Sequence, residues 1–136
     1  MRNFYQLAFD GYVNGTAPVY SYSNLNQQLG RVDQLVIGGY TAQVSVSTGT
    51  ANLTVQVEHS FDNFRWQNRN TAAEIPSTTS LSTAAETNVS GNDGDPTARP
   101  TLAFARLRIA LGATGGGLNP AGQVRIWVTG RDRSEQ

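Results

Sequence analysis

The sequence predicts an all-β fold, an antiparallel β-sandwich or jelly roll of about eight strands. Three observations predict it. Hydrophobic and polar residues alternate in several short stretches, turns rich in Gly, Asn and Pro separate these stretches, and no stretch has the periodicity of an amphipathic helix. A chain of 136 residues suits one domain with a core of its own. No cysteine is present, so no disulfide supports that core.

Four stretches carry the clearest strand pattern: residues 41–47, 51–60, 101–111 and 123–129. Leu53, Val55 and Val57 alternate with polar residues in the second of these, so they should face the core. In the stretches at residues 101–111 and 123–129, the side chains that should face the core are Ala103, Ala105, Leu107, Ile109, Leu111, Val124, Ile126 and Val128. The turn at residues 48–50 separates the first two stretches, which predicts a hairpin between them.

The remaining elements have weaker patterns. Strands are expected at residues 4–13, 18–22 and 31–40, the last ended by Gly38 and Gly39. A further strand is expected at residues 80–84, within the otherwise irregular segment 67–100. Such a long irregular segment is typical of a functional or interface loop. Residues 1–5 are predicted to be an N-terminal arm and residues 130–136 a frayed C-terminal tail of the single domain 1–136.

The stretch around the second strand ends in a bend with a cluster of aromatic residues. Asp62 and Asn63 can turn the backbone through side-chain hydrogen bonds, after which Phe64 and Trp66 follow. We expect Trp66 to pack across this bend.

Charge argues against several classes of partner. The formal net charge is zero, which does not favour a nucleic-acid binder held by bulk charge. No apolar stretch is long enough for a transmembrane helix, and the N-terminus lacks the pattern of a signal peptide.

All ten cationic residues are arginine. This bias fits a GC-rich genome, and it also fits the planar and stacked contacts that arginine makes at protein interfaces.

Catalytic and metal-binding patterns are scarce. His59 is the only histidine, and neither an orienting acid nor an oxyanion hole accompanies the neighbouring Ser60, so a hydrogen-bonded structural histidine is expected. Asp93 and Asp95 flank a glycine and form a weak calcium candidate against the alternative of a solvated turn. We therefore expect no enzyme, no cofactor and no metal.

Interface candidates come from arginine and aromatic residues that should point outward. Rows of this composition are typical of binding hot spots, although the same side chains could cover a second layer of the protein. The candidates are Arg2, Phe4, Tyr5, Phe64, Arg65, Trp66, Arg69, Phe104, Arg106, Arg108, Arg125 and Trp127.

Residues 55–66, VQVEHSFDNFRW, resemble a strand–turn–Trp pattern of phage virion structural β-proteins, in particular capsid decoration (cement) proteins. Ser60, Asp62 and Trp66 match that pattern, and Asn63 replaces its usual glycine. The same turn is similar to one in discoidin-type sugar- and lipid-binding sandwiches. The resemblance implies a virion protein that forms a homo-oligomer, a trimer, on the shell and binds the major capsid protein or another virion protein. Its location would be the virion, and the host cytoplasm during assembly.

A carbohydrate-binding module is the alternative. Trp66, Trp127 and the tyrosines Tyr20, Tyr22 and Tyr40 would then form its sugar-stacking platform.

Overall fold

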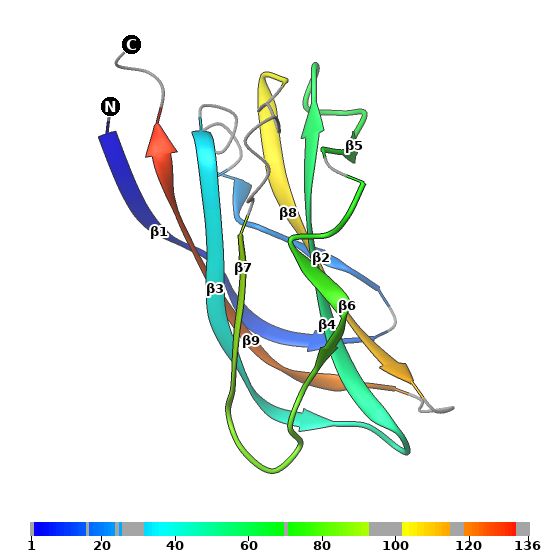
Figure 1. Cartoon of the computed structure of the whole chain (residues 1–136). Helices are drawn as coiled ribbons and strands as arrows, with labels where there is room; N and C mark the ends of the chain where they lie inside the picture. The colour runs from blue at the N-terminus through cyan, green and yellow to red at the C-terminus, as the bar shows by residue number, and fades with distance from the viewer. Residues whose placement is uncertain are drawn as a thin grey trace.

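The computed structural model describes residues 2–15, 17–23, 25, 32–69, 71–92, 102–114 and 119–132. Within these ranges the chain forms nine strands in two antiparallel sheets, which confirms the predicted β-sandwich (Figure 1). The strands are β1 (Arg2–Asn14), β2 (Val19–Tyr20), β3 (Val32–Ser45), β4 (Thr50–Ser60), β5 (Gln67–Asn68), β6 (Ile75–Ser80), β7 (Thr87–Asn92), β8 (Phe104–Thr114) and β9 (Ala121–Asp132). Sheet A has the order β1-β9-β3-β7, and sheet B has the order β2-β8-β4-β5, with β6 also paired to β4.

The strand pairs are nested, as in a jelly roll. The first strand pairs with the last, β2 with β8, β3 with β7 and β4 with β6. Taken in order, these pairs form one long antiparallel ribbon that ends with the pair of β4 and β6. β5 lies between these two strands in the sequence and pairs with β4 as an extra strand. Pairing of β3 with β9 and of β4 with β8 joins neighbouring parts of the ribbon into the two sheets. The chain therefore has the double-sheet arrangement of a jelly roll.

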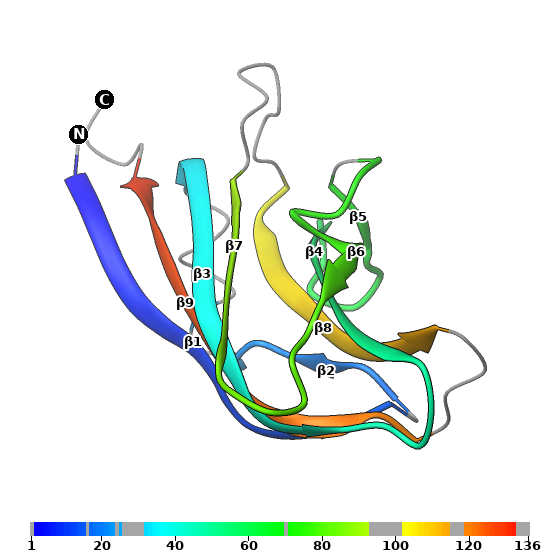
Figure 2. The same cartoon turned by 60° about the horizontal axis from the view of Figure 1, so that its bottom comes forward.

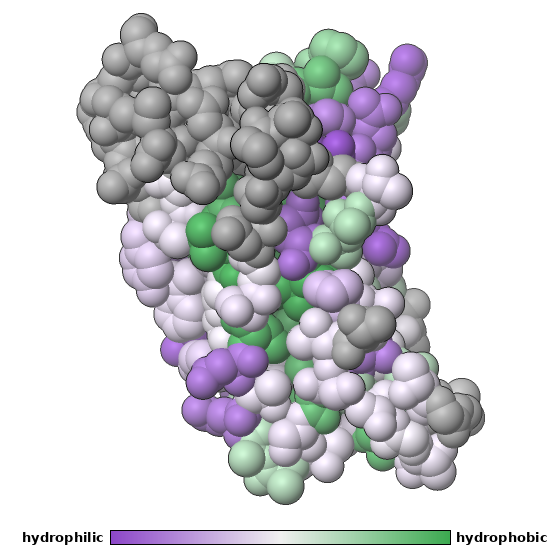
Figure 3. Space-filling view, viewed as in Figure 1, coloured by the Kyte–Doolittle hydropathy of each residue, from purple (hydrophilic) through white to green (hydrophobic). Residues whose placement is uncertain are grey.

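The two sheets pack face to face around a core of aliphatic side chains (Figure 2). Leu53, Leu107, Ile109 and Ile126 are fully buried between them. Seen from the side of Figure 1, hydrophobic residues show along the middle of the molecule and hydrophilic residues flank them (Figure 3). The alternation in β4, β8 and β9 thus predicts the core-facing side chains correctly, apart from Ala103, which precedes β8 and is exposed.

The predicted hairpin between residues 41–47 and 51–60 is wrong. β3 belongs to sheet A and β4 to sheet B, so the connection through residues 46–49 crosses from one sheet to the other. The glycines at 38 and 39 also do not end a strand, because β3 continues through them to Ser45. A Cβ atom on Gly39 would collide with the carbonyl oxygen of Arg125. Gly39 is therefore needed for the close approach of β3 to β9.

β-Bulges in β1 and β3 shift the side-chain alternation. In β1 the register with β9 changes between Leu7 and Phe9, so Phe9 packs against the core while Tyr5 is exposed. In β3 it changes after Ala42, where Gln43 has a positive φ of 53°. A bulge adds one residue to one strand and reverses the facing of those that follow. Phe9 therefore does not share the face of Tyr5, and Val44 does not share the face of Ala42.

The chain ends are paired where the structure describes them. Arg2 lies opposite Asp132 and Tyr5 opposite Thr129, so residues 2–5 and 130–132 belong to sheet A rather than to a separate arm and a frayed tail. The start of β1 and the end of β9 lie side by side in Figure 1. The expected strand at residues 80–84 is also misplaced. Residues 81–86 connect β6 to β7, and their turn is held by hydrogen bonds from Ser82 N to Thr87 Oγ1 and from Ala84 N to Ser82 Oγ.

Candidate docking surfaces

The outward arginine and aromatic side chains of the last two long strands lie on two different faces of the molecule. β8 is in sheet B and β9 in sheet A, so their outward side chains point away from the sandwich in opposite directions. Arg106 and Arg108 belong to one outer face, and Arg125 and Trp127 to the other. All four alternate with buried neighbours, as predicted, but they do not form one continuous row.

The sheet A surface consists of Tyr5, Asp10, Tyr40, Arg125 and Trp127. The Trp127 ring lies near two tyrosine rings, with its centroid 6.4 Å from that of Tyr5 and 6.1 Å from that of Tyr40. Tyr5 is nearly parallel to it, at 10° between planes. Aromatic pairs at such distances attract one another beyond the burial of their area. The three rings come from β1, β9 and β3, so strand pairing assembles this surface.

Arg125 occupies the polar part of the same surface. Its Nη2 donates to Asp10 Oδ2 at 3.0 Å, and its guanidinium carbon lies 5.5 Å from the Tyr40 ring centroid and 5.8 Å from that of Trp127. The hydrogen bond to Asp10 raises the pKa of Arg125 above its ordinary value. The Asp10 carboxylate neutralises the charge of Arg125. The sheet A surface therefore combines three aromatic rings with an ion pair that has no net charge.

On sheet B, Arg106 is enclosed by its neighbours. Its guanidinium carbon lies 3.8 Å from the Tyr20 ring centroid and 4.2 Å from that of Trp66. Its Nε donates to Glu58 Oε1 at 2.9 Å, and the two side chains are only 20% and 12% exposed. Cation–π contact on two rings and a shielded ion pair make this group a structural clamp. We call Tyr20, Glu58, Trp66 and Arg106 the Arg106 clamp.

Residues 61–66, between β4 and β5, form a turn fixed by one carboxylate. Asp62 Oδ1 accepts hydrogen bonds from Phe64 N, Arg65 N and Ser60 Oγ, each at 2.9 Å. The backbone N–H groups of Arg65 and Phe64, together with the Ser60 hydroxyl, lower the pKa of Asp62 to about 2. Asn63 takes the left-handed conformation that this turn needs, with φ of 61°. The turn thus depends mainly on Asp62 rather than on Trp66 packing across it, since Trp66 is half-buried beside Arg106.

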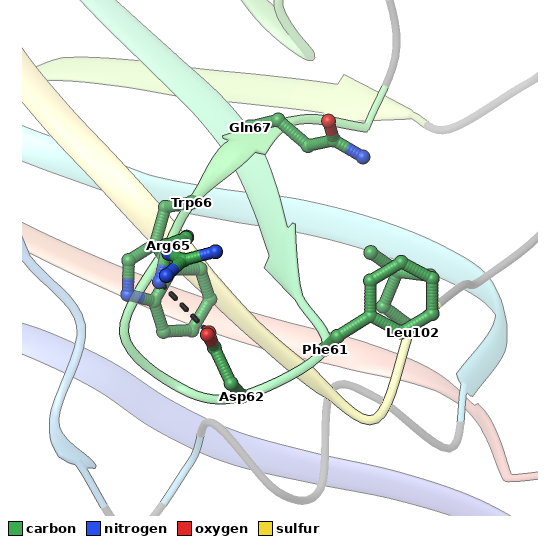
Figure 4. Close-up of a pocket in the computed structure, with 6 residues that line it drawn as sticks. All are labelled: Phe61, Asp62, Arg65, Trp66, Gln67 and Leu102. Atoms are coloured by element: carbon green, nitrogen blue, oxygen red, sulfur yellow. Dashed lines mark hydrogen bonds between the residues drawn. The ribbon is translucent and has the colours of Figure 1, made fainter.

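A hollow of about 250 Å³ opens beside this turn. Figure 4 shows Phe61 and Leu102 on one side of it and Arg65 and Trp66 on the other. Asp62 and Gln67 complete its lining. Phe61 is 77% exposed, and Phe64 on the same turn is 81% exposed. The turn therefore presents aromatic rings to solvent next to a hollow with an apolar and a cationic side.

Several predicted interface residues lie elsewhere or lack a described side chain. Arg2 and Phe4 are placed only as backbone in β1. Phe104 is half-buried opposite Ser60. Arg69 is half-buried, and its backbone N donates to Val57 O at 2.9 Å. Arg108 lies between Tyr20 and Gln56 in the strand register and is half-buried.

His59 has a structural setting. Its Nε2 lies 3.3 Å from Gln67 Nε2 across the β4–β5 pair, and its Nδ1 is buried without a partner among the described residues. Partial burial, and then the nearby Arg69 cation, lower the pKa of His59 below its ordinary value. His59 is therefore neutral at pH 7. The calcium candidates Asp93 and Asp95 lie outside the described residues.

The acidic partners of the arginines carry no signal in the sequence. Asp10 and Glu58 lie far from Arg125 and Arg106 in the sequence, and each becomes a neighbour only through strand register. Phe61 was not among the predicted interface residues, and it follows an inward residue at the end of β4. The one usable signal was the density of aromatic residues in the turn.

The described ranges contain no group of three or more acidic, histidine or cysteine side chains that could hold a metal. Within the same ranges, no helix has the length and hydrophobicity to span a membrane.

No protein-family model and no curated protein sequence matches this chain. Solved structures do match, and one of them is described as the structure of infectious bursal disease virus, Gx strain, with a TM-score of 0.60 and 16% sequence identity. The match covers 99% of this chain and 34% of that chain, so this chain spans about a third of the length of the other. At this identity, the likeness establishes a shared fold.

Proposed function

We propose that this chain is a non-enzymatic virion structural protein, specifically a capsid decoration or cement protein that binds the shell surface and stabilises it. The observation that supports this most directly is the jelly-roll order over almost the whole chain, which it shares with part of a chain in a virus structure. Jelly rolls are a recurrent architecture of viral capsid domains. Other proteins use the same architecture, so the proposal also depends on the surfaces.

Both outer faces support docking to another protein. The sheet A surface offers clustered aromatic rings around a paired arginine, and sheet B carries the exposed turn at residues 61–66. Arginine, tyrosine and tryptophan are the residue types enriched at binding hot spots. The partner would be the major capsid protein or another virion protein. A homo-oligomer, a trimer by the resemblance in residues 55–66, would place several such surfaces on the shell.

Co-sedimentation with shells assembled from the major capsid protein of the same virus tests this function. We expect saturable binding of the wild-type chain and a higher melting temperature of the decorated shells. Tyr5→Ala and Trp127→Ala on sheet A, and Arg108→Ala on sheet B, report which face contacts the shell, because each face serves as the control for the other. Absence of wild-type binding, with the chain folded, contradicts the proposal.

A carbohydrate-binding module is the second candidate, and the ring row of Tyr5, Trp127 and Tyr40 is what favours it. The wider platform does not form as expected. Tyr20 and Trp66 enclose Arg106, and the Tyr22 hydroxyl hydrogen-bonds the backbone of Asp10. Binding to an oligosaccharide array that is lost in Trp127→Ala, together with no binding to shells, would favour this module.

A further inference from the structure

The turn at residues 61–66 stands out from the rest of the surface by its exposed apolar area. Phe64 and Phe61 are the two most exposed large hydrophobic residues of the described chain, at 81% and 77%. Exposed single hydrophobic residues are ordinary, but here two phenylalanines lie within four residues, beside a hollow lined by Trp66 and Leu102. Two exposed phenylalanines on one turn, next to a hollow with apolar walls, are typical of an interaction site.

This turn is also ordered although it is exposed. Asp62 receives three hydrogen bonds at its Oδ1 atom, and its own N–H donates to Ser60 Oγ at 3.2 Å. At its base, Trp66 packs on Arg106, which is tied to Glu58. A loop that is already fixed loses little conformational entropy when it binds a partner. The network therefore holds the phenylalanines in place for docking.

The walls of the hollow indicate what it can accept. Phe61 and Leu102 provide apolar contact, whereas the exposed Arg65 provides a cationic group for a planar carboxylate (Figure 4). Among the described residues that line the hollow, Asp62 is the acidic one, and it already uses one carboxylate oxygen for the turn. The hollow therefore has one apolar wall and one cationic wall. A ligand with an apolar group next to a carboxylate is complementary to both.

We propose that the turn at residues 61–66 is a docking anchor for a protein segment that presents an apolar side chain beside an Asp or Glu carboxylate. The apolar side chain enters the hollow, the carboxylate pairs with Arg65, and Phe64 packs on the partner around it. This inference rests on the proposed docking role and specifies its contact element.

The first test measures shell binding of Phe61→Ala, Phe64→Ala and the double variant. Tyr12→Ala is the matched control, because Tyr12 is a 64%-exposed aromatic residue on β1, away from this turn. We expect the double variant to bind about tenfold or more weakly, as for hot-spot residues, and Tyr12→Ala to bind as wild type. Wild-type binding of the double variant, with intact folding, overturns the inference.

The second test uses the free chain, so that failure of the virion role and failure of the anchor can be told apart. Nuclear magnetic resonance titration with 3-phenylpropionate should shift the Trp66 indole and Arg65 signals, whereas the neutral 3-phenylpropanamide should bind several-fold more weakly. Arg65→Gln should remove that preference. If shells do not bind but this preference is present, the anchor stands and the virion role fails. If the wild-type chain shows no shift with either compound, the anchor is wrong.

Discussion

The two outer faces of the sandwich use the same residue types in different ways. On sheet A, Arg125 pairs with Asp10, and both side chains keep about a third of their surface in solvent, at 34% and 29% exposure. On sheet B, Arg106 lies between two aromatic rings and its ion pair with Glu58 is more shielded. An arginine–aromatic cluster can therefore be a surface for a partner or a device that holds strands together. Burial of the guanidinium distinguishes the two.

On sheet B, this difference distinguishes residues that stabilise the sheet from residues that a partner protein can reach. The Arg106 clamp joins β2, β8, β4 and the turn, so its main role is to support this face of the sandwich. The exposed groups on this face include Phe61, Phe64 and Arg65. On sheet A the aromatic rings themselves are the accessible feature. Four predictions test this contrast, from the largest expected effect to the smallest.

Gly39→Ala should be the most damaging of these changes, because the new Cβ would collide with the Arg125 carbonyl and push β3 away from β9. We expect a loss of about 3 kcal/mol in the free energy of unfolding. Gly38→Ala is the control, since its Cβ would meet only Val89 O at 3.6 Å. Urea denaturation measures both, and equal midpoints would show that the sheet A surface does not depend on this close strand contact.

Arg106→Ala should destabilise the chain by about 1–3 kcal/mol, through the loss of two cation–π contacts and a shielded ion pair. Arg108→Ala on the same strand should change stability by less than about 0.5 kcal/mol. Arg125→Ala should have a smaller effect than Arg106→Ala, because its ion pair is more exposed. Urea denaturation midpoints compare the three variants. A larger loss of stability for Arg125→Ala than for Arg106→Ala would show that Arg125, and not Arg106, is the structural arginine.

Stability should fall as the pH drops below about 6.5, where His59 of the unfolded chain begins to gain a proton. The pKa of His59 is lower in the folded state, so the unfolded state binds more protons in this range. The stabilisation is fully present above the unfolded pKa and is lost as pH falls toward the folded pKa. Thermal melts from pH 7 to pH 5 measure it. Since His59 is the only histidine, His59→Gln should flatten the curve; an unchanged slope would contradict the assignment.

Asp62 should contribute a second dependence at lower pH. Its pKa is lowered from 3.8 to about 2, so its stabilisation is present above the unfolded value and is lost between about pH 4 and pH 2. Asp62→Asn should weaken this dependence and loosen the turn without unfolding the sandwich. Amide hydrogen exchange at Phe64 and Arg65 reports the loosening. Unchanged protection of both amides in the variant would show that Asp62 does not hold the turn.

Sequence periodicity was reliable for strands without bulges and unreliable for strands with them. In β9, Val124, Ile126 and Val128 are all buried, as their spacing predicts. In β1 and β3 one inserted residue reverses the faces, and neither Phe9 nor Gln43 carries a signal that marks the bulge. The turn at residues 61–66 could be predicted in part, because Asp and Asn bend the backbone through local hydrogen bonds.

By itself, the sequence determined that the chain is all-β, which side chains of β4, β8 and β9 form the core, and where the Asp62 turn lies. These features depend on contacts between residues close together in the chain. Only the tertiary structure decided that β3 and β4 lie in different sheets, and that Arg106 meets Tyr20, Glu58 and Trp66 while Arg125 meets Asp10. Those contacts join distant segments, so they depend on strand order and register, which period-2 alternation does not encode.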